Sequence, residues 1–131
     1  MCGIAGLWIA GGGDRAALEM RATRMADTLV HRGPDDCGVW TDGAGGMAIS
    51  HRRLSIVDLS PAGHQPMLSA DGRYVIALNG EIYNHAQMRG ELESAGAAPA
   101  WRGHSDTEVL LAAISRWGIT GALERAAGMF A

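Results

Sequence analysis

The chain is poor in several features that assign a protein to a class. It has 131 residues with only two cysteines, two tyrosines and one phenylalanine, so its four tryptophans supply most of the aromatic bulk. No apolar run approaches the ~20 residues that a transmembrane helix needs, and no charged start precedes a signal-peptide core. We therefore expect a cytoplasmic protein with free thiols at Cys2 and Cys37.

Positive charge is also scarce. Eleven basic residues stand against 14 acidic ones, which gives a net charge of −3 and no electrostatic reason to expect nucleic acid or a membrane as partner. Hydrophobic residues, at 47%, are sufficient for one globular domain, and 19 glycines indicate many tight turns or close backbone approaches.

The most informative residue is Cys2, in the start MCGIAG. A methionine before so small a residue is expected to be removed, which would place a thiol and a free α-amine on one residue. Such an amine can act as a base at neutral pH, so nucleophile and base would share one amino acid. The alternative is a small buried cysteine without chemistry, and the first six residues leave both open.

Hydrophobic periodicity predicts strands and helices in turn. We expect a strand over residues 4–9, then a helix capped by Asp14 that buries Leu18, Ala22, Met25 and Leu29 and stops at Gly33-Pro34. Residues 39–41 and 47–49 read as a hairpin, and residues 74–78 as a strand. A short helix holds Met88 and Leu92 and ends near Gly96.

The clearest boundary is the capping box Ser105-x-x-Glu108, which starts a helix that ends with Gly118 as its cap. A further short helix is predicted over residues 122–127, before the apolar run 129–131. Gly11-Gly12-Gly13 lacks the Lys-Ser/Thr ending of a phosphate loop and reads as a turn. The five histidines lack metal-ligand spacing, so we expect no metal.

Three polar segments favour a functional site: HRGPDD at 31–36, HRRLSIVD at 51–58 and NGEIYN at 79–84. Each places charged or amide groups beside apolar residues, and buried polar groups must find partners. Taken alone, Asn79-Gly80 is better explained as a type I′ hairpin turn.

In order along the chain, MCGIAG, HRGPDD, RRLSIVD, AGHQPM, NGEIYN and SDTE resemble the glutaminase domain of class II glutamine amidotransferases, most closely that of glutamine-hydrolysing asparagine synthetases. The resemblance spans residues 1–131. It implies that Cys2 is the nucleophile that attacks the side-chain carbonyl of glutamine. The Asn79 side chain and the Gly80 backbone N–H would form the oxyanion hole.

The same resemblance implies a binding pocket for glutamine. Arg53 would bind the α-carboxylate, a role that suits a bidentate guanidinium, and Glu81 and Asp106 would lie near the α-ammonium. Leu54, Ser55, Ile56 and Val57 would line the pocket through backbone and apolar contacts. Read from the residues alone, Asp106 is a helix-dipole partner in the first turn, and both roles can hold together.

The fold that the resemblance implies is α+β, a four-layer αββα sandwich of the N-terminal nucleophile hydrolase type. The family's domain is longer, so we expect residues 1–131 to be an incomplete glutaminase domain that lacks the strands beyond residues 129–131. An unpaired sheet edge there would invite aggregation or a homodimer.

The implied reaction is hydrolysis of L-glutamine to glutamate and ammonia for ATP-dependent amidation of aspartate. No cofactor is expected in this domain, and ATP and Mg²⁺ would belong to a C-terminal synthetase domain of the parent chain. Two alternatives stay open, namely a non-catalytic glutamine-binding or degenerate fragment and an amidotransferase with another ammonia acceptor. If Met1 is retained, the Cys2 nitrogen is an amide and the chain should be inactive.

Overall fold

A computed structural model describes residues 1–131, which form two compact units. Unit 1 consists of Met1–Ser55, His64–Pro66 and Ala77–Asn79. Unit 2 consists of Ile56–Gly63, Met67–Ile76 and Gly80–Ala131. The mixture of helices and antiparallel sheets confirms the α+β class.

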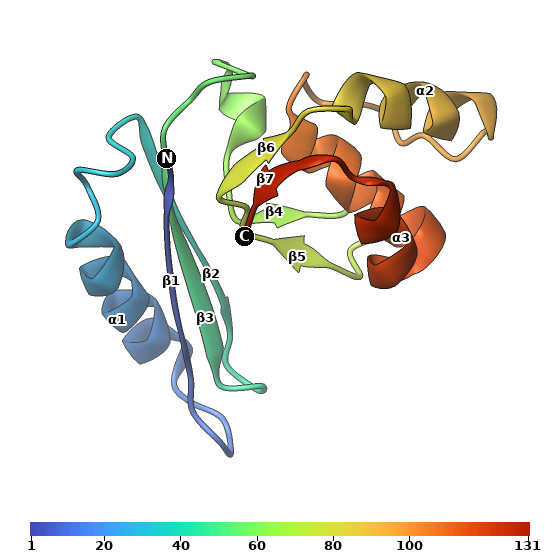
Figure 1. Cartoon of the computed structure of the whole chain (residues 1–131). Coiled ribbons are helices and arrows are strands. Elements are labelled where there is room, and N and C mark those ends of the chain that lie inside the picture. The colour runs from blue at the N-terminus through green and yellow to red at the C-terminus, as the bar shows by residue number, and fades with distance from the viewer. The chain divides into compact units, whose positions relative to one another are not determined.

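Unit 1 is a three-stranded antiparallel sheet with one helix. Its elements are β1 (Gly3–Trp8), α1 (Arg15–Asp27), β2 (Asp36–Asp42) and β3 (Met47–Arg53). The strand order is β1-β3-β2, so the predicted β2–β3 hairpin is confirmed and the N-terminal strand adds to its β3 edge. Helix α1 covers one face of this sheet (Figure 1).

Helix α1 begins as predicted, because the Asp14 carboxylate accepts a hydrogen bond of 2.8 Å from the Ala17 backbone N–H. Its buried face is the i, i+4 series Leu18, Ala22 and Ala26. Leu18 and Ala22 pack with Ala48 of β3 in a core that Leu7, Ile9 and Val39 complete. The prediction was wrong for Met25, which is exposed, and for Leu29, which lies beyond the helix end.

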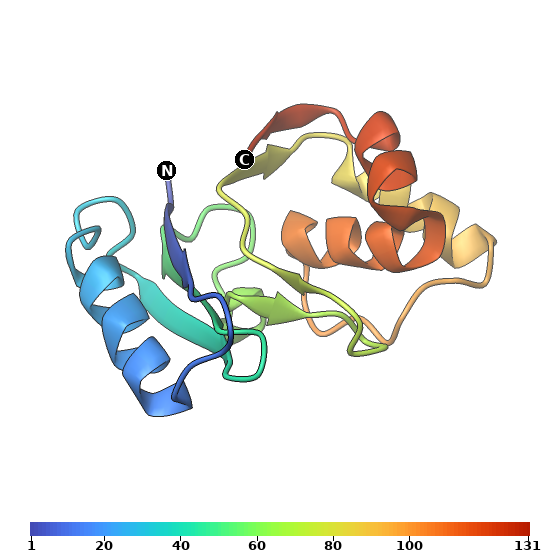
Figure 2. The same cartoon turned by 90° about the horizontal axis from the view of Figure 1, so that it is seen from below.

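Unit 2 combines two helices with two short antiparallel ribbons and a 3-10 turn. Its elements are η1 (Pro61–Gly63), β4 (Met67–Leu68), β5 (Val75–Ile76), β6 (Gly80–Ile82), α2 (His85–Ser94), α3 (Asp106–Arg125) and β7 (Gly128–Phe130). Strand β4 pairs with β5, and β6 pairs with β7. Helices α2 and α3 pack together (Figure 2), and Met88, Leu92, Leu110 and Leu111 are buried on them.

The start of α3 confirms the predicted cap, since the Ser105 hydroxyl accepts a hydrogen bond of 3.1 Å from the Glu108 N–H. Gly118 has φ 75° and ψ 169°, which breaks the helical conformation there. Gly118 is therefore a kink between two helical segments. This agrees with the predicted end at Gly118 and the separate short helix, although the second segment stops at Arg125.

The predicted strand over residues 74–78 is shorter, because only Val75–Ile76 pairs with a neighbour. Asn79-Gly80 is not a hairpin turn, contrary to its reading in isolation. The strands before and after it pair with different partners, β4 and β7, so the backbone leaves one ribbon and enters another at this point. No helix in the structure has the length and apolar content to cross a membrane.

Candidate functional site

Cys2 of unit 1 is held at both its backbone and its side chain. The Arg32 Nε donates to the Cys2 carbonyl oxygen over 3.0 Å, and the Leu54 backbone N–H donates to the Cys2 sulfur over 3.4 Å. The thiol in turn points to the Leu54 carbonyl at 3.7 Å. Cys2 and Cys37 are both half-buried, and both thiols are free. The nucleophile candidate is therefore fixed in place at both its backbone and its sulfur.

The pairing of β1 with β3 explains this placement. Gly3 lies opposite Arg52, so the residue before β1 reaches the end of β3, where Arg53 and Leu54 follow. The two arginines have different environments. Arg52 lies on the α1 side, with an ion pair of 2.6 Å to Asp27 and a hydrogen bond of 3.2 Å to the Ala26 carbonyl. Arg53 is buried and lies on the opposite face, because neighbouring side chains alternate.

The HRGPDD segment forms hydrogen bonds with the end of β3 and with the residues that follow it. The Asp35 N–H donates to the Arg53 carbonyl over 3.0 Å, and the Asp35 carboxylate accepts the Ser55 N–H over 2.8 Å. A side chain at Gly33 would overlap the Arg52 carbonyl, so the close approach of this loop requires glycine. Asp35 and Gly33 thus define the backbone at Arg53 and Ser55, two of the residues expected to contact glutamine.

The expected pocket-lining residues are divided between the units. Leu54 and Ser55 belong to unit 1 and are half-buried, whereas Ile56 and Val57 begin unit 2 with side chains that are 57% and 41% exposed. Of these four, the structure brings Leu54 into contact with the Cys2 sulfur, through its backbone rather than its side chain.

Asn79 closes unit 1, and Gly80 opens strand β6 of unit 2. A Cβ atom at Gly80 would overlap the Met129 carbonyl oxygen of β7, so pairing of β6 with β7 already requires a glycine. The Asn79 side-chain oxygen is buried and accepts no hydrogen bond. Preceding Leu78 is buried and lies outside any strand.

The acidic candidates belong to unit 2. Glu81 is half-buried in β6, opposite Met129. Asp106 is buried in the first turn of α3, where its two carboxylate oxygens accept the N–H groups of Ile82 and Thr107, each over 2.8 Å. Asp106 therefore joins β6 to α3, a structural contact that the expected roles in glutamine binding and at the helix dipole did not include.

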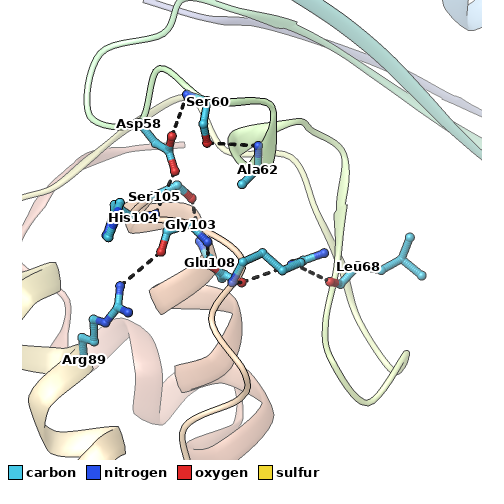
Figure 3. A network of polar contacts seen from close by, with 10 residues as sticks. Asp58, Ser60, Ala62, Leu68, Arg89, Gly103, His104, Ser105 and Glu108 are labelled. Carbon is cyan, nitrogen blue, oxygen red and sulfur yellow. Dashed lines mark hydrogen bonds and ion pairs between the residues drawn. The ribbon is translucent and has the colours of Figure 1, made fainter.

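Two buried carboxylates fix the chain that leads to Asp106 (Figure 3). Asp58 accepts the N–H groups of Ser60 over 2.7 Å and of His104 over 2.8 Å. Glu108 accepts the backbone N–H and Nε of Arg102 over 2.9 and 3.1 Å, and the Gly103 N–H over 3.2 Å. The RRLSIVD and SDTE segments are thus linked within unit 2.

Three of the histidines make separate hydrogen bonds. His51 contacts the Leu78 carbonyl at 3.0 Å, His64 the Asp36 carboxylate at 2.7 Å, and His85 the Ile82 carbonyl at 2.9 Å. Burial lowers the pKa of His51 below the ordinary 6.5. The structure assembles no group of three or more metal-ligating side chains.

Four residues with supporting contacts are absent from the site predicted from the sequence, namely Arg32, Asp35, His51 and Gln65. Their motifs were visible, since Arg32 and Asp35 lie in HRGPDD, His51 precedes RRLSIVD and Gln65 lies in AGHQPM. Their partners were not, because each contacts a backbone group 13 to 30 residues away and such contacts leave no local spacing pattern.

The comparison with known proteins covers the whole chain. The family model for the glutamine amidotransferase domain matches residues 1–131. A Mycobacterium tuberculosis (strain H37Rv) protein, provisionally named as a glutamine-hydrolyzing asparagine synthetase, is 43% identical over 128 residues, covering 92% of this chain and 19% of its own. Asparagine synthetase (glutamine-hydrolyzing) 1 of Bacillus subtilis (strain 168) is 39% identical over 135 residues, covering 100% of this chain and 20% of its own.

Asparagine synthetase B (glutamine-hydrolyzing) of Escherichia coli (strain K12) is 39% identical over 119 residues, covering 90% of this chain and 20% of its own. The chain thus spans about one fifth of the length of the curated relatives that it matches. Because the family model matches every residue, the chain belongs to the glutamine amidotransferase domain family.

Proposed function

We propose that the chain hydrolyses L-glutamine to glutamate and ammonia with Cys2 as nucleophile. The observation that carries the proposal is the fixation of Cys2, whose carbonyl is bound by Arg32 and whose sulfur is bound by the Leu54 N–H. A cysteine that only fills space needs neither contact. The match of residues 1–131 to the glutamine amidotransferase domain supports glutamine as the substrate that this cysteine attacks.

The proposed reaction begins with removal of Met1, which frees the α-amine of Cys2. The sulfur attacks the carboxamide carbon as the amine accepts the thiol proton, and a C–S bond forms. The resulting oxyanion is bound by the Asn79 side chain and the Gly80 N–H. The C–N bond then breaks as the ammonium returns its proton to the leaving nitrogen. Ammonia departs, and water hydrolyses the thioester to glutamate and free thiol.

We further propose that Arg53 binds the α-carboxylate of glutamine, with Glu81 and Asp106 near its α-ammonium and residues 54–57 lining the pocket. The burial of Arg53 at the end of β3, directly before Leu54, supports this choice. Asp106 retains lone pairs beyond the two N–H groups that it accepts, so its structural contacts leave it capable of binding an ammonium.

For the protein as a whole we propose that the ammonia serves ATP-dependent synthesis of asparagine from aspartate. The proposal rests on relatives named as glutamine-hydrolyzing asparagine synthetases. ATP and Mg²⁺ would then act in a C-terminal synthetase domain and not on these residues. An acceptor other than aspartate is the main alternative, and incubating the full-length protein with ATP, glutamine and candidate acceptors distinguishes the two.

We also propose that the protein is cytoplasmic. For the complete fold, we propose the four-layer αββα sandwich of N-terminal nucleophile hydrolases. Unit 1 supplies a helix on an antiparallel sheet, and unit 2 supplies strands packed on helices, which are the components of such a sandwich. A crystal structure of the full-length protein tests the layers.

Glutamate release from glutamine at neutral pH tests the catalytic proposal. We expect Cys2→Ala and Cys2→Ser to abolish turnover while the thermal unfolding temperature stays unchanged. Cys37→Ala is the matched control, because Cys37 is also a free, half-buried thiol in unit 1. Turnover that survives Cys2→Ala would refute the proposed nucleophile, and intact mass shows in parallel whether Met1 is absent. A folded, glutamine-binding protein without turnover would favour the non-catalytic alternative.

A further inference from the structure

The peptide groups on both sides of Leu78 are held by side chains instead of a sheet. The Leu78 N–H donates to the Gln65 side-chain oxygen over 2.6 Å, and its carbonyl lies 3.0 Å from His51 Nε2. His51, Gln65 and Leu78 are only 1%, 6% and 5% exposed, so water does not replace these bonds. All three residues belong to unit 1 and lie directly before Asn79.

The state of the His51 ring follows from this contact. A carbonyl oxygen only accepts hydrogen bonds, so Nε2 carries the proton. Burial lowers the pKa of the ring, which is therefore neutral, with its Nδ1 unprotonated. That Nδ1 atom is buried without a hydrogen-bond partner, an arrangement that costs stability. An apolar side chain would avoid this cost, so the Nε2–H donor is the imidazole's specific contribution at this position.

The sheet of unit 1 places both partners of Leu78. His51 and Arg53 are two residues apart on β3 and share the face turned away from α1. On the neighbouring strand, a side chain at Gly38 would overlap the Gln65 carbonyl oxygen. Glycine at position 38 therefore lets the Gln65 backbone approach the sheet closely, from where its amide reaches the Leu78 N–H.

We propose that His51 and Gln65 are positioning residues for the oxyanion hole. By holding the Leu78 peptide from both sides, they fix the backbone that presents the Asn79 side chain to the reacting carbonyl. This inference rests on the proposed glutaminase activity. His51 does not exchange protons with substrate, because its donor is committed to Leu78 and its ring stays neutral.

The expected kinetic signature is a fall in kcat with KM for glutamine unchanged. The oxyanion develops in the transition state, so a misplaced donor weakens transition-state binding and leaves ground-state binding intact. Loss of one oxyanion donor typically costs about 10²–10³-fold in rate. Displacing such a donor should cost less, and we expect about 10- to 100-fold in kcat for His51→Leu.

Three variants of the full-length protein test the proposal. His51→Leu removes the donor to Leu78, whereas His51→Gln places an amide N–H near the former Nε2 and should restore most of kcat. Ser50→Ala is the matched control. Ser50 is fully buried on the same strand and donates to the Ala5 carbonyl over 3.2 Å, so its loss removes a comparable bond away from Leu78.

A second measurement isolates the oxyanion hole from substrate binding. L-Glutamate γ-semialdehyde adds the Cys2 thiol across its C=O bond, forming a C–S bond and an oxygen at the oxyanion position with no leaving group. We expect weaker inhibition of His51→Leu by this aldehyde by the same factor as the fall in kcat. The rate of Cys2 alkylation by iodoacetamide, which needs no oxyanion hole, should stay unchanged.

The outcomes separate this proposal from the one it rests on. Turnover in the parent protein that survives Cys2→Ala refutes the glutaminase mechanism itself. With that mechanism intact, a parental kcat for His51→Leu overturns the positioning role, as does an equal loss in Ser50→Ala or a loss that falls on KM. If His51→Leu does not fold, Gln65→Met removes the other bond to Leu78, and a parental kcat there overturns the proposal.

Discussion

The Leu54 backbone N–H donates a hydrogen bond to the sulfur of Cys2, across 52 residues of sequence and a distance of 3.4 Å. This contact connects the proposed nucleophile directly to the RRLSIVD segment. Residue 54 was expected only to line the glutamine pocket. Its backbone also helps to orient the sulfur, because β1 and β3 pair in a register that brings the residue before Gly3 to the end of β3.

Arg53→Lys tests glutamine recognition. A lysine ammonium keeps the charge but cannot form the planar bidentate contact that guanidinium makes with a carboxylate. We expect KM for glutamine to rise about tenfold or more, with a smaller change in kcat, in a steady-state glutaminase assay. The estimate corresponds to loss of one charge-assisted hydrogen bond, about 1.5–3 kcal/mol.

Arg52→Lys is its control. Arg52 binds Asp27 and the Ala26 carbonyl, so its replacement should disturb the contact with α1 and leave KM close to the parental value. If Arg52→Lys raises KM and Arg53→Lys does not, the assignment of the carboxylate-binding arginine is reversed.

Local signals predicted much of the fold. Asp14 and Ser105 cap helices as expected, and the β2–β3 hairpin forms, since both features depend on residues close in sequence. The two compact units have no local signal in the sequence, because their membership alternates along the chain between residues 55 and 80. Hydrophobic periodicity reports local secondary structure, and it does not report which segments pack into the same unit.

For the candidate site, the resemblance supplied residue types, and the structure supplied their surroundings. Asn79-Gly80 illustrates the difference, because the dipeptide favours a hairpin turn locally. Long-range pairing of Gly80 with Phe130 overrides that preference. The side chains of Arg32, Asp35 and His51 each contact a backbone group in a distant segment. Composition and local spacing cannot reveal such contacts.

Glu108→Ala should destabilise the protein more than Ser105→Ala. The Glu108 carboxylate is 4% exposed and accepts three N–H groups from Arg102 and Gly103. Its removal leaves the backbone N–H groups of Arg102 and Gly103 without an acceptor, whereas the exposed Arg102 guanidinium keeps its bond to the Leu68 carbonyl. Each unsatisfied donor costs about 1–3 kcal/mol, so we expect a loss of about 3 kcal/mol in the free energy of unfolding. Ser105→Ala removes one capping bond, worth about 1 kcal/mol. Urea unfolding measures both, and equal losses would contradict the role given to the Glu108 carboxylate.

Two glycines should respond to alanine in opposite directions. Gly90 lies inside α2, and an added Cβ would meet no atom within 4 Å, so Gly90→Ala should raise the free energy of unfolding by about 0.5–1 kcal/mol. A Cβ at Gly33 would overlap the Arg52 carbonyl, so Gly33→Ala should be destabilising and should lower glutaminase activity. A Gly33→Ala variant with parental stability and activity would show that the HRGPDD loop can move away from β3.

Stability should fall as the pH drops below about 6.5, through His51. Burial lowers the pKa of this ring in the folded state, with smaller effects from the surrounding groups: Asp36 raises the pKa, whereas Arg53 and His64 lower it. In the unfolded chain, His51 therefore takes up a proton near pH 6.5. In the folded chain, it takes up this proton only at a lower pH. Between these two pKa values, each pH unit of acidification lowers the free energy of unfolding by up to about 1.4 kcal/mol.

Chemical denaturation between pH 7.5 and pH 5 measures this slope, and His51→Gln should flatten it because the amide does not titrate. His64→Gln is the control, because His64 is a second histidine of unit 1 but is far more exposed, with 51% of its side chain accessible to solvent. The two slopes need comparison only above pH 5, where most carboxylates are still ionised. If His51→Gln keeps the parental slope, the pH dependence arises elsewhere, and the neutral His51 ring that the positioning role requires would lose its support.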